Sequence, residues 1–373
     1  MCPDFDLALT LKSGQVFRWK EESPSVFSGQ IAGTPARISQ QNGCLWLKGV
    51  SREQIEDFFA LDADLPAITR EIDVDPVIHE ALQRYPGLRV IRQDPWECAA
   101  SFMLSAYNNI PRLTAMIEQL CVRFAPPVSA GPSSARERFV RARSERVRRD
   151  CWMKYAARTS KLTHRLPSGA GRPSALRPAR AEGERALTDE LVASTRGEEG
   201  ARVNPRTSGA GSTGRATLRA GENANWLGRR PSAHSFPRPE ALAGVSERVL
   251  RACGLGYRAP YLKGMARAVA SGRADLEAWR ELDDEGLRRA LLTLPGIGEK
   301  VVECVMLFAY GRPAAFPVDV WIGRAMREWY FRRRKVSDKK IREFARKRFG
   351  PHCGWAQQYL YCLARWHRRD SRI

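Results

Sequence analysis

Two runs with apolar residues at helical spacing, 287–294 and 301–309, are separated by the short segment Pro295-Gly296-Ile297-Gly298-Glu299-Lys300. The two glycines let the backbone turn tightly and approach another molecule closely. The amides after them open the second helix, where unpaired N–H groups and the helix dipole favour a phosphate group. The segment therefore predicts a helix–hairpin–helix that holds a DNA backbone without reading its sequence. A plain corner between two helices is the alternative interpretation.

The charge of the chain favours the same partner. Lys and Arg number 62 against 41 Asp and Glu, so the formal net charge is +21. Such an excess makes nucleic acid the default partner. The longest apolar run, Val301–Ala309, is interrupted by Glu303 and is far too short to cross a bilayer, and the acidic N-terminus lacks the basic start of a signal peptide. We expect neither a membrane protein nor a secreted protein.

Composition and periodicity divide the chain into segments. Residues 1–75 contain short β-prone runs at 16–19, 26–31 and 44–47, and then a helix at 53–61 whose start, Ser51 with Gln54, resembles a capping box. Helical spacing of apolar residues recurs in 76–126 and 235–373, at 98–104, 113–122, 287–294, 301–309 and 341–349. These patterns predict an α+β protein, in which a small N-terminal antiparallel sheet domain packs on a mainly helical domain.

Residues 127–234 differ in composition from the rest of the chain. Between Pro127 and Ser235 there are 22 Lys and Arg, 20 of them Arg, against 10 Asp and Glu, with few large apolar residues. Such a segment cannot bury enough surface to offset its chain entropy, so we expect it to be mostly disordered. Two interpretations stay open: an insert without a specific role, or a polybasic arm that adds non-specific DNA affinity.

The cysteines indicate reduced thiols. There are nine, an odd number, and none forms a Cys-x-x-Cys pair. The C-terminal pair, Cys353 and Cys362, has no nearby third and fourth ligand, which argues against a four-cysteine iron–sulfur cluster.

Two residues suggest chemistry beyond binding. Lys300 opens the helix after the hairpin, close to apolar Val301 and Val302, and both surroundings disfavour its ammonium form. Asp319 follows nineteen residues later, in Phe316-Pro317-Val318-Asp319-Val320-Trp321. A free amine can attack the anomeric carbon of a nucleotide, and a nearby carboxylate can stabilise the cationic sugar as the base departs. The pair is a minimal apparatus for cleaving an N-glycosidic bond through a Schiff base, which needs no metal or organic cofactor. Taken singly, each residue is more often a solvated lysine or a helix cap.

An ordered set of six motifs resembles the 8-oxoguanine DNA glycosylases of the helix-hairpin-helix superfamily. The motifs cover about 265 residues and exclude the Arg-rich segment; they lie at 9–19, 94–112, 254–259, 294–300, 317–319 and 354–357. Trp321 stands where the animal enzymes have a histidine, and the run 318–322 looks more like the bacterial branch. The resemblance implies an enzyme that flips an oxidised guanine out of duplex DNA, cleaves its glycosidic bond and nicks the strand by β-elimination.

The resemblance also implies roles for residues of the reaction site. Lys300 would be the nucleophile and Asp319 its electrostatic partner. Gly14 would offer its carbonyl to the N7 hydrogen of oxidised guanine, and Gln357 would read the Watson–Crick edge. Tyr361 and Cys304 would face the flipped base, where stacking is worth about 1–3 kcal/mol. Core packing alone is the alternative explanation for both.

Further residues would contact the rest of the duplex. Arg112 and Arg258 would contact the orphaned cytosine, and Tyr257 would wedge into the opened stack. An asparagine of the family fills the vacated space; here the run is Tyr107-Asn108-Asn109, whereas the animal enzymes have three asparagines. Gly296 and Gly298 would let the hairpin approach the backbone. We expect a monomer acting on damaged double-stranded DNA, cytoplasmic and nucleoid-associated in a prokaryote or nuclear in a eukaryote.

Three alternatives stay open at the level of sequence. The first is a glycosylase of the same superfamily for another damaged base. The second is a non-catalytic DNA-binding module that uses only the hairpin and the basic charge. The third is an inactive relative whose fold is spoiled by residues 127–234.

Overall fold

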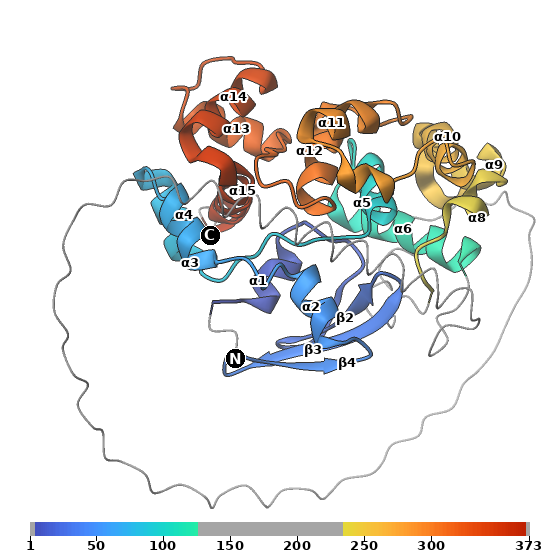
Figure 1. The fold of residues 1–373 in the computed structure, drawn as a ribbon, viewed down its shortest axis with the longest axis horizontal. Coiled ribbons are helices and arrows are strands. Elements are labelled where there is room, and N and C mark those ends of the chain that lie inside the picture. Colours follow the sequence, from blue (N-terminus) through green and yellow to red (C-terminus); the bar gives the residue numbers. More distant parts are fainter. Residues whose placement is uncertain (1–3, 126–233, 371–373) are drawn as a thin grey trace, which may run out of the picture. The chain divides into compact units, whose positions relative to one another are not determined.

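The computed structural model of the protein describes residues 4–125 and 234–370, and side chains as far as residue 366. The expected disordered segment, 127–234, lies outside the described residues except for His234. In the described ranges a small sheet is followed by helices (Figure 1). The α-helices before residue 126 are α1 (Leu7–Lys12), α2 (Arg52–Phe58), α3 (Leu65–Ile72), α4 (Pro76–Arg84), α5 (Pro95–Leu104) and α6 (Ile110–Phe124). Those after residue 234 are α8 (Pro239–Ala243), α9 (Glu247–Leu250), α10 (Ala259–Ala270), α11 (Asp284–Leu292), α12 (Glu299–Phe308), α13 (Val320–Trp329), α14 (Asp338–Phe349) and α15 (Cys353–Asp370).

Short helical turns connect several of these helices. A π-helical turn, η3 (Arg251–Leu255), and a 3-10 turn, η4 (Gly256–Arg258), join α9 to α10. Two further 3-10 turns are η5 (Ala278–Glu281), before α11, and η6 (Gly350–His352), before α15. The helical runs expected at 98–104, 113–122, 287–294, 301–309 and 341–349 correspond to α5, α6, α11, α12 and α14.

The sheet is a four-stranded antiparallel meander. Its strands are β1 (Lys20–Ser23), β2 (Val26–Ile31), β3 (Thr34–Gln41) and β4 (Cys44–Lys48), in the order β1-β2-β3-β4. Phe27 of β2 pairs with Ile38 of β3, and both side chains are buried. This face packs with α1 and α2 around a small core that includes Phe5, Phe58 and Phe59. The α+β expectation is confirmed.

The prediction of a first strand at residues 16–19 was wrong. Residues 16–19 form no strand, and β1 begins at Lys20. Phe17 instead packs on Phe102 of α5 with ring centroids 5.4 Å apart, and Arg18 pairs with Glu97 of α5 at 3.2 Å. Trp19 packs toward the sheet core, 5.9 Å from the ring of Phe58. The segment connects the two cores, because its side chains are divided between them.

Three further differences concern two elements that were not predicted and one helix end. Strand β3 was not predicted, because its exposed polar positions and Pro35 resemble a turn. Helix α1 was also missed, although Asp6 caps it with a hydrogen bond to the Leu9 N–H. The capping box of Ser51 with Gln54 is confirmed at α2, but the helix ends at Phe58 and not at residue 61. Ala60 has φ +49°, which an α-helix cannot continue.

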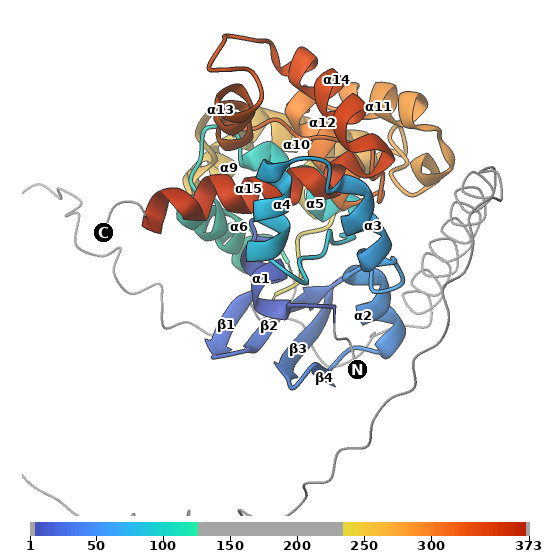
Figure 2. The same cartoon turned by 90° about the vertical axis from the view of Figure 1, so that its left-hand side faces the viewer.

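The helical region has one large core, to which α3 and α4 contribute along with the later helices. Helix α15 crosses this region in contact with α3, α4, α13 and α14 (Figure 2). Helix α12 contacts both α5 and α11, so the lysine at its start lies where the two halves of the helical region meet. Within the part of the chain that the structure describes, no helix is both long and apolar enough to span a membrane.

Candidate functional site

The hairpin between α11 and α12 adopts a tight turn. Gly296 has φ +80°, and a Cβ at this position would lie 2.7 Å from the Cβ of Tyr261, so glycine is required. Gly298 is the N-cap of α12 and supplies no side chain to the first amides of that helix. The first N–H groups of α12 are therefore available to an anion.

Lys300 lies in the first turn of α12 and is half-buried. Its Nζ donates a hydrogen bond to the Oγ of Ser105 at 3.0 Å, and the Ser105 hydroxyl donates to the carbonyl of Phe102 at 2.6 Å. The Nζ also lies 5.2 Å from the ring centroid of Phe102. The amine is thus held by Phe102 of α5 and by Ser105, the residue after α5, both of which lie about 200 residues before Lys300 in the sequence.

Asp319 is the N-cap of α13. Its carboxylate accepts the Ile322 N–H at 2.8 Å. Burial is the largest influence on this group and raises its pKa, while the hydrogen bonds from the start of α13 and the charge of Lys300 act in the opposite direction. The carboxylate and the amine therefore share one electrostatic environment, with Arg365 as a further nearby charge.

Cys304 lies one turn after Lys300 on α12, and its side chain is buried. Burial raises the pKa of this thiol to about 11; Lys300 counteracts the shift, and Asp319 adds to it. The thiol is thus protonated at neutral pH and interacts with both proposed catalytic groups. Cys304, Lys300 and Asp319 thus lie within electrostatic range of one another, and their joint role in a reaction stays a prediction.

Gly14 and Tyr361 lie against each other. Gly14 has φ +85°, and a Cβ there would lie 3.1 Å from the Tyr361 hydroxyl. The preceding residue of the same turn is also attached to α15, because Gln358 donates to the Ser13 carbonyl at 3.0 Å. Burial raises the pKa of Tyr361 to about 12, against the charge of Arg365, and Asp319 adds to the shift. The N-terminal segment and α15 thus meet beside Asp319.

Gln357 points into the protein with one end unpaired. Its side chain is 4% exposed, and its Nε2 donates to the Pro317 carbonyl at 3.2 Å. Its Oε1 is buried and has no hydrogen-bond partner among the described residues. A buried amide oxygen without a partner is costly, which favours a ligand N–H at this position.

The loop between α5 and α6 carries the Tyr107-Asn108-Asn109 run. The side chain of Tyr107 is 97% exposed on a left-handed backbone, φ +52°. Asn108 donates to the Leu104 carbonyl at 3.0 Å, and its Oδ1, like that amide oxygen of Gln357, is buried without a hydrogen-bond partner within the described ranges. Asn109 caps α6 by accepting the N–H of Arg112, whose side chain is exposed.

Arg258 is buried, whereas a residue that contacts DNA is expected to be exposed. It is 5% exposed, and its guanidinium donates twice to the carbonyl of Ala106, immediately before Tyr107. It also lies 4.4 Å from the ring centroid of Tyr257, which is 52% exposed. Arg258 therefore links the two loops that present Tyr107 and Tyr257. Its contact with an opposite base stays a prediction.

Sequence reasoning did not find Ser105, Phe102 or Arg365. Ser105 and Phe102 belong to the run 98–104 and its end, which reads as ordinary helix core, and only the fold brings them to Lys300. No sequence signal marked them. Within the described ranges, no group of three or more His, Cys, Asp or Glu is placed to hold a metal ion.

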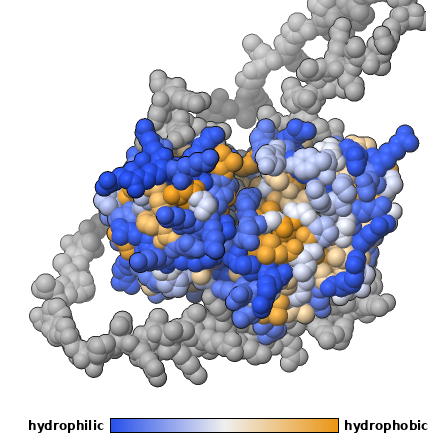
Figure 3. Space-filling model, turned by 90° about the horizontal axis from the view of Figure 1, so that it is seen from above, coloured by the Kyte–Doolittle hydropathy of each residue, from blue (hydrophilic) through white to orange (hydrophobic). Residues whose placement is uncertain are grey.

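The surface seen from above carries hydrophilic residues around its margin and apolar residues near its middle, beside a hollow (Figure 3). Among the exposed large apolar and aromatic residues of the chain are several from the loops and helix ends just described, namely Tyr107, Tyr257, Tyr261, Val320 and Trp321. Val320 and Trp321 directly follow Asp319.

Comparison with known proteins identifies the two parts of this fold. Residues 3–99 match the N-terminal domain of 8-oxoguanine DNA glycosylase, and residues 216–351 match the HhH-GPD superfamily of base excision DNA repair proteins. The N-glycosylase/DNA lyase OGG1 of Arabidopsis thaliana is 23% identical over 96% of this chain and 77% of its own length. A protein of Methanothermobacter thermautotrophicus named "Probable N-glycosylase/DNA lyase" is 36% identical over 35% of this chain, and the match spans about half of its length, 48%.

Solved structures share the fold. MBOgg1, solved in complex with a low-affinity DNA ligand, is 25% identical with a TM-score of 0.68, covering 98% of this chain and 93% of that protein. The 8-oxoguanine glycosylase/lyase of Clostridium acetobutylicum, in complex with duplex DNA containing cytosine opposite 8-oxoguanine, is 22% identical with a TM-score of 0.67, covering 99% and 93%. The expected family is confirmed, while the bacterial branch stays a prediction. The chain belongs to the HhH-GPD superfamily of base excision DNA repair proteins and carries the N-terminal domain of the 8-oxoguanine DNA glycosylases.

Proposed function

We propose that the protein removes 8-oxoguanine from duplex DNA and then cleaves the strand at the resulting site. The observation that carries this proposal is that Lys300 and Cys304 of α12 interact electrostatically with Asp319, while Gln357, whose Oε1 is buried and unpaired, holds the Pro317 carbonyl two residues before Asp319. The names of the relatives, N-glycosylase/DNA lyase, support the same pair of activities.

The reaction begins with attack by the Nζ lone pair of Lys300 on C1′ of the extruded nucleotide. The glycosidic bond breaks, its electrons leave with the base, and the departing base takes a proton. The Asp319 carboxylate stabilises the positive charge that develops on the sugar. Ring opening converts the lysine adduct to a Schiff base, which acidifies the C2′ hydrogen. Loss of that proton expels the 3′ phosphate and nicks the strand.

Recognition of the base uses the groups between the N-terminal turn and α15. Oxidised guanine carries an N7–H that guanine lacks, and the carbonyl of Gly14 would accept it. An N–H of the Watson–Crick edge would satisfy the Oε1 of Gln357. Tyr361 and the neutral thiol of Cys304 would contact the faces of the ring. A normal guanine would lose the first of these bonds.

The exposed aromatic residues would hold the opened duplex. Tyr107 and Tyr257 are presented by two loops that Arg258 links, and they would fill and wedge the gap left by the flipped base. Arg112 and Arg258 would contact the opposite cytosine, and Asn108 and Asn109 the adjoining strand. The hairpin amides around Gly296 and Gly298 would bind backbone phosphate.

One chain carries every group in this scheme, which supports action as a monomer. The protein would meet this DNA substrate at the nucleoid in the cytoplasm of a prokaryote or in the nucleus of a eukaryote. Sequence features of the run 318–322 support the bacterial branch of the family.

Borohydride trapping tests the proposal. The protein is incubated with an 8-oxoguanine:cytosine duplex and borohydride, which reduces a Schiff base to a stable covalent adduct. We expect an adduct with the natural protein and none with Lys300→Gln, while both proteins bind the duplex. Stable binding without any adduct, on this duplex or on duplexes carrying other damaged bases, would show a DNA-binding module and refute the enzyme.

A further inference from the structure

Glu303 is a buried charge that the scheme above does not use. It lies on α12, three residues after Lys300, and its side chain has no exposed surface. A carboxylate removed from water is costly unless charges and hydrogen bonds compensate it. Its partners therefore indicate what this group contributes to the fold.

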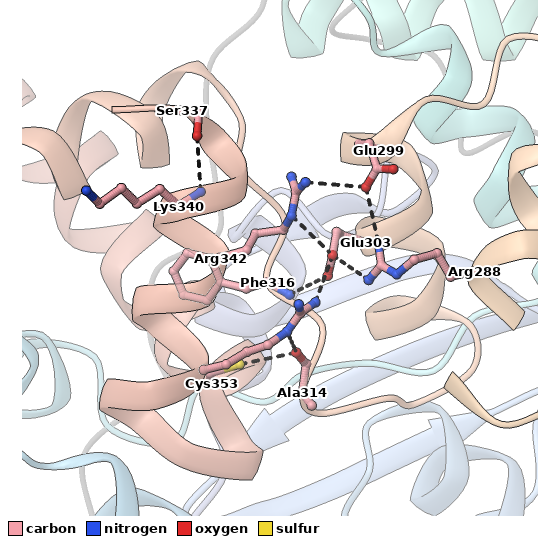
Figure 4. A network of polar contacts seen from close by, with 10 residues as sticks. Arg288, Glu299, Glu303, Ala314, Phe316, Ser337, Lys340, Arg342 and Cys353 are labelled. Atoms are coloured by element: carbon pink, nitrogen blue, oxygen red, sulfur yellow. Dashed lines mark hydrogen bonds and ion pairs between the residues drawn. The ribbon is translucent and has the colours of Figure 1, made fainter. Parts of the chain in front are cut away.

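One oxygen of Glu303 is surrounded by arginines (Figure 4). Its Oε1 accepts from Arg288 of α11 at 2.6 Å and from Arg346 of α14 at 2.9 Å, and it lies 3.5 Å from the Nε of Arg342. Glu299, at the start of α12, accepts from Arg288 and Arg342 as well. Three arginines and two carboxylates thus tie α12 to α11 and α14.

The other oxygen of Glu303 contacts the backbone that leads to Asp319. Its Oε2 accepts the N–H of Phe316 at 2.7 Å, and Phe316 is fully buried. Phe316 precedes Asp319 by three residues, in a connection without regular secondary structure. The arginines alone could neutralise the carboxylate, so the bond to Phe316 is not needed for charge compensation. Its effect is to attach the connection before α13 to the helix that carries Lys300.

Further contacts hold the same connection. The carbonyl of Pro317 accepts from Gln357, and the carbonyl of Ala314 accepts from the Nε of Arg346 at 3.1 Å. Asp319 then begins α13 as its N-cap. The connection is thus held from α15 and α14 on one side and from α12 on the other. On α12, the Met306 carbonyl holds the start of the connection through the Arg312 N–H, whereas Glu303 holds it at Phe316, closer to Asp319.

We propose that Glu303 is a positioning residue, which fixes the carboxylate of Asp319 relative to the Nζ of Lys300 by holding the Phe316 N–H from α12. The inference rests on the proposed function, because it assigns Glu303 to the geometry of that reaction. A displacement of about 1 Å between reacting groups can cost about 100-fold in rate. Loss of this bond should therefore slow the chemical step while the DNA-binding surface stays intact.

Glu303→Asp tests the bond while keeping the negative charge. The side chain shortens by about 1.5 Å, so the carboxylate can keep the flexible arginines but not the Phe316 N–H. With saturating protein and an 8-oxoguanine:cytosine duplex, we expect the single-turnover rate constant of base release to fall 10- to 100-fold. The Kd for the same duplex should stay within threefold of that of the natural protein.

A double-mutant cycle with Asp319→Asn separates positioning from general weakening of the fold. If Glu303 acts through Asp319, Glu303→Asp should cause little further loss once the Asp319 charge is gone. A merely structural role predicts that the two losses multiply. Multiplying losses, or an unchanged rate constant in Glu303→Asp, would overturn the inference.

Arg346 and Arg288 provide a matched pair of variants. Both donate to the Oε1 of Glu303, but only Arg346 also contacts the Ala314 carbonyl of the connection. We expect Arg346→Met to slow base release at least fivefold in the natural background and to cause no further loss in a protein that already carries Asp319→Asn. Arg288→Met should leave the rate constant unchanged. Should Glu303→Asp fail to fold by circular dichroism, this pair tests whether the connection positions Asp319 at all, which the role of Glu303 requires, and equal effects of the two variants refute that role.

Failure of the inference is distinguishable from failure of the proposed function. Base release by the natural protein combined with multiplying losses overturns the positioning role alone. A folded natural protein that releases no base and forms no borohydride adduct overturns the proposed function, and the positioning role with it.

Discussion

Asp319 combines a structural and a chemical task that one substitution can separate. As N-cap of α13, its side chain accepts the Ile322 N–H, and asparagine can accept the same bond. We expect Asp319→Asn to change the free energy of unfolding by less than about 1 kcal/mol. Asp319→Ala, which cannot cap the helix, should destabilise by about 1 kcal/mol more. Thermal unfolding followed by circular dichroism measures both.

The chemical loss should be much larger than the structural one. A carboxylate about 5 Å from the cationic sugar, at an effective dielectric constant of about 20, stabilises it by about 3 kcal/mol. Removing this charge should slow base release by about 150-fold. Single-turnover release from an 8-oxoguanine:cytosine duplex measures the rate constant, and a duplex with a preformed abasic site tests Lys300 separately by borohydride trapping. Trapping should persist in Asp319→Asn.

The pH dependence gives a second, independent check. Burial raises the pKa of Asp319 above its ordinary value of 3.8. As pH falls through that raised pKa the carboxylate takes up a proton, so base release should slow, and Asp319→Asn should abolish this acid limb. The contribution to stability has the opposite sign: because the folded state binds the proton more tightly than the unfolded chain, protonation of this group favours folding. Its contribution is fully present below the unfolded pKa and is lost as pH rises through the folded pKa.

Three results would refute the reasoning on Asp319. The first is a rate constant in Asp319→Asn within a few-fold of that of the natural protein. The second is an acid limb that persists in the variant. The third is equal activity of the asparagine and alanine variants combined with equal stability, which would show that the side chain contributes neither charge nor cap.

Other residues of the site give further expectations. Gln357→Ala should reduce discrimination between 8-oxoguanine and guanine about 10- to 100-fold in release rate, since a lost base contact is worth about 1–3 kcal/mol; unchanged discrimination would exclude Gln357 from the pocket. Gly14→Ala places a Cβ 3.1 Å from the Tyr361 hydroxyl on a left-handed backbone, so it should destabilise by about 1 kcal/mol in thermal unfolding and weaken lesion binding. Tyr107→Gly should leave the free energy of unfolding unchanged or raise it by up to about 1 kcal/mol, because glycine adopts the left-handed backbone conformation of this position without strain. The affinity for the lesion duplex, measured by titration, should fall 5- to 100-fold. The thiol of Cys304, with its pKa raised to about 11, should react with iodoacetamide at pH 8 at least tenfold more slowly in the folded protein than in the unfolded chain, as mass spectrometry can follow.

Local sequence patterns determined several of the helices and the hairpin of this protein. Apolar spacing at 287–294 and 301–309 and the glycines between them were enough to predict two helices joined by a tight turn, and with it the place of Lys300. The capping box at Ser51 was equally readable. Each of these features depends on residues within a few positions of one another, so periodicity and capping rules describe them without knowledge of the fold.

Only the tertiary structure decided what contacts these local elements. Residues 16–19 have the composition of a strand, yet they form none, because their side chains are divided between two cores. Arg258 looks like a solvated arginine in the sequence, but the fold buries it against the Ala106 carbonyl. Asp319 reaches the surroundings of Lys300 across nineteen residues because Glu303 and Gln357 hold the connection before it. Such contacts join segments distant in the chain, and their geometry depends on the packing of whole helices, which no local pattern encodes.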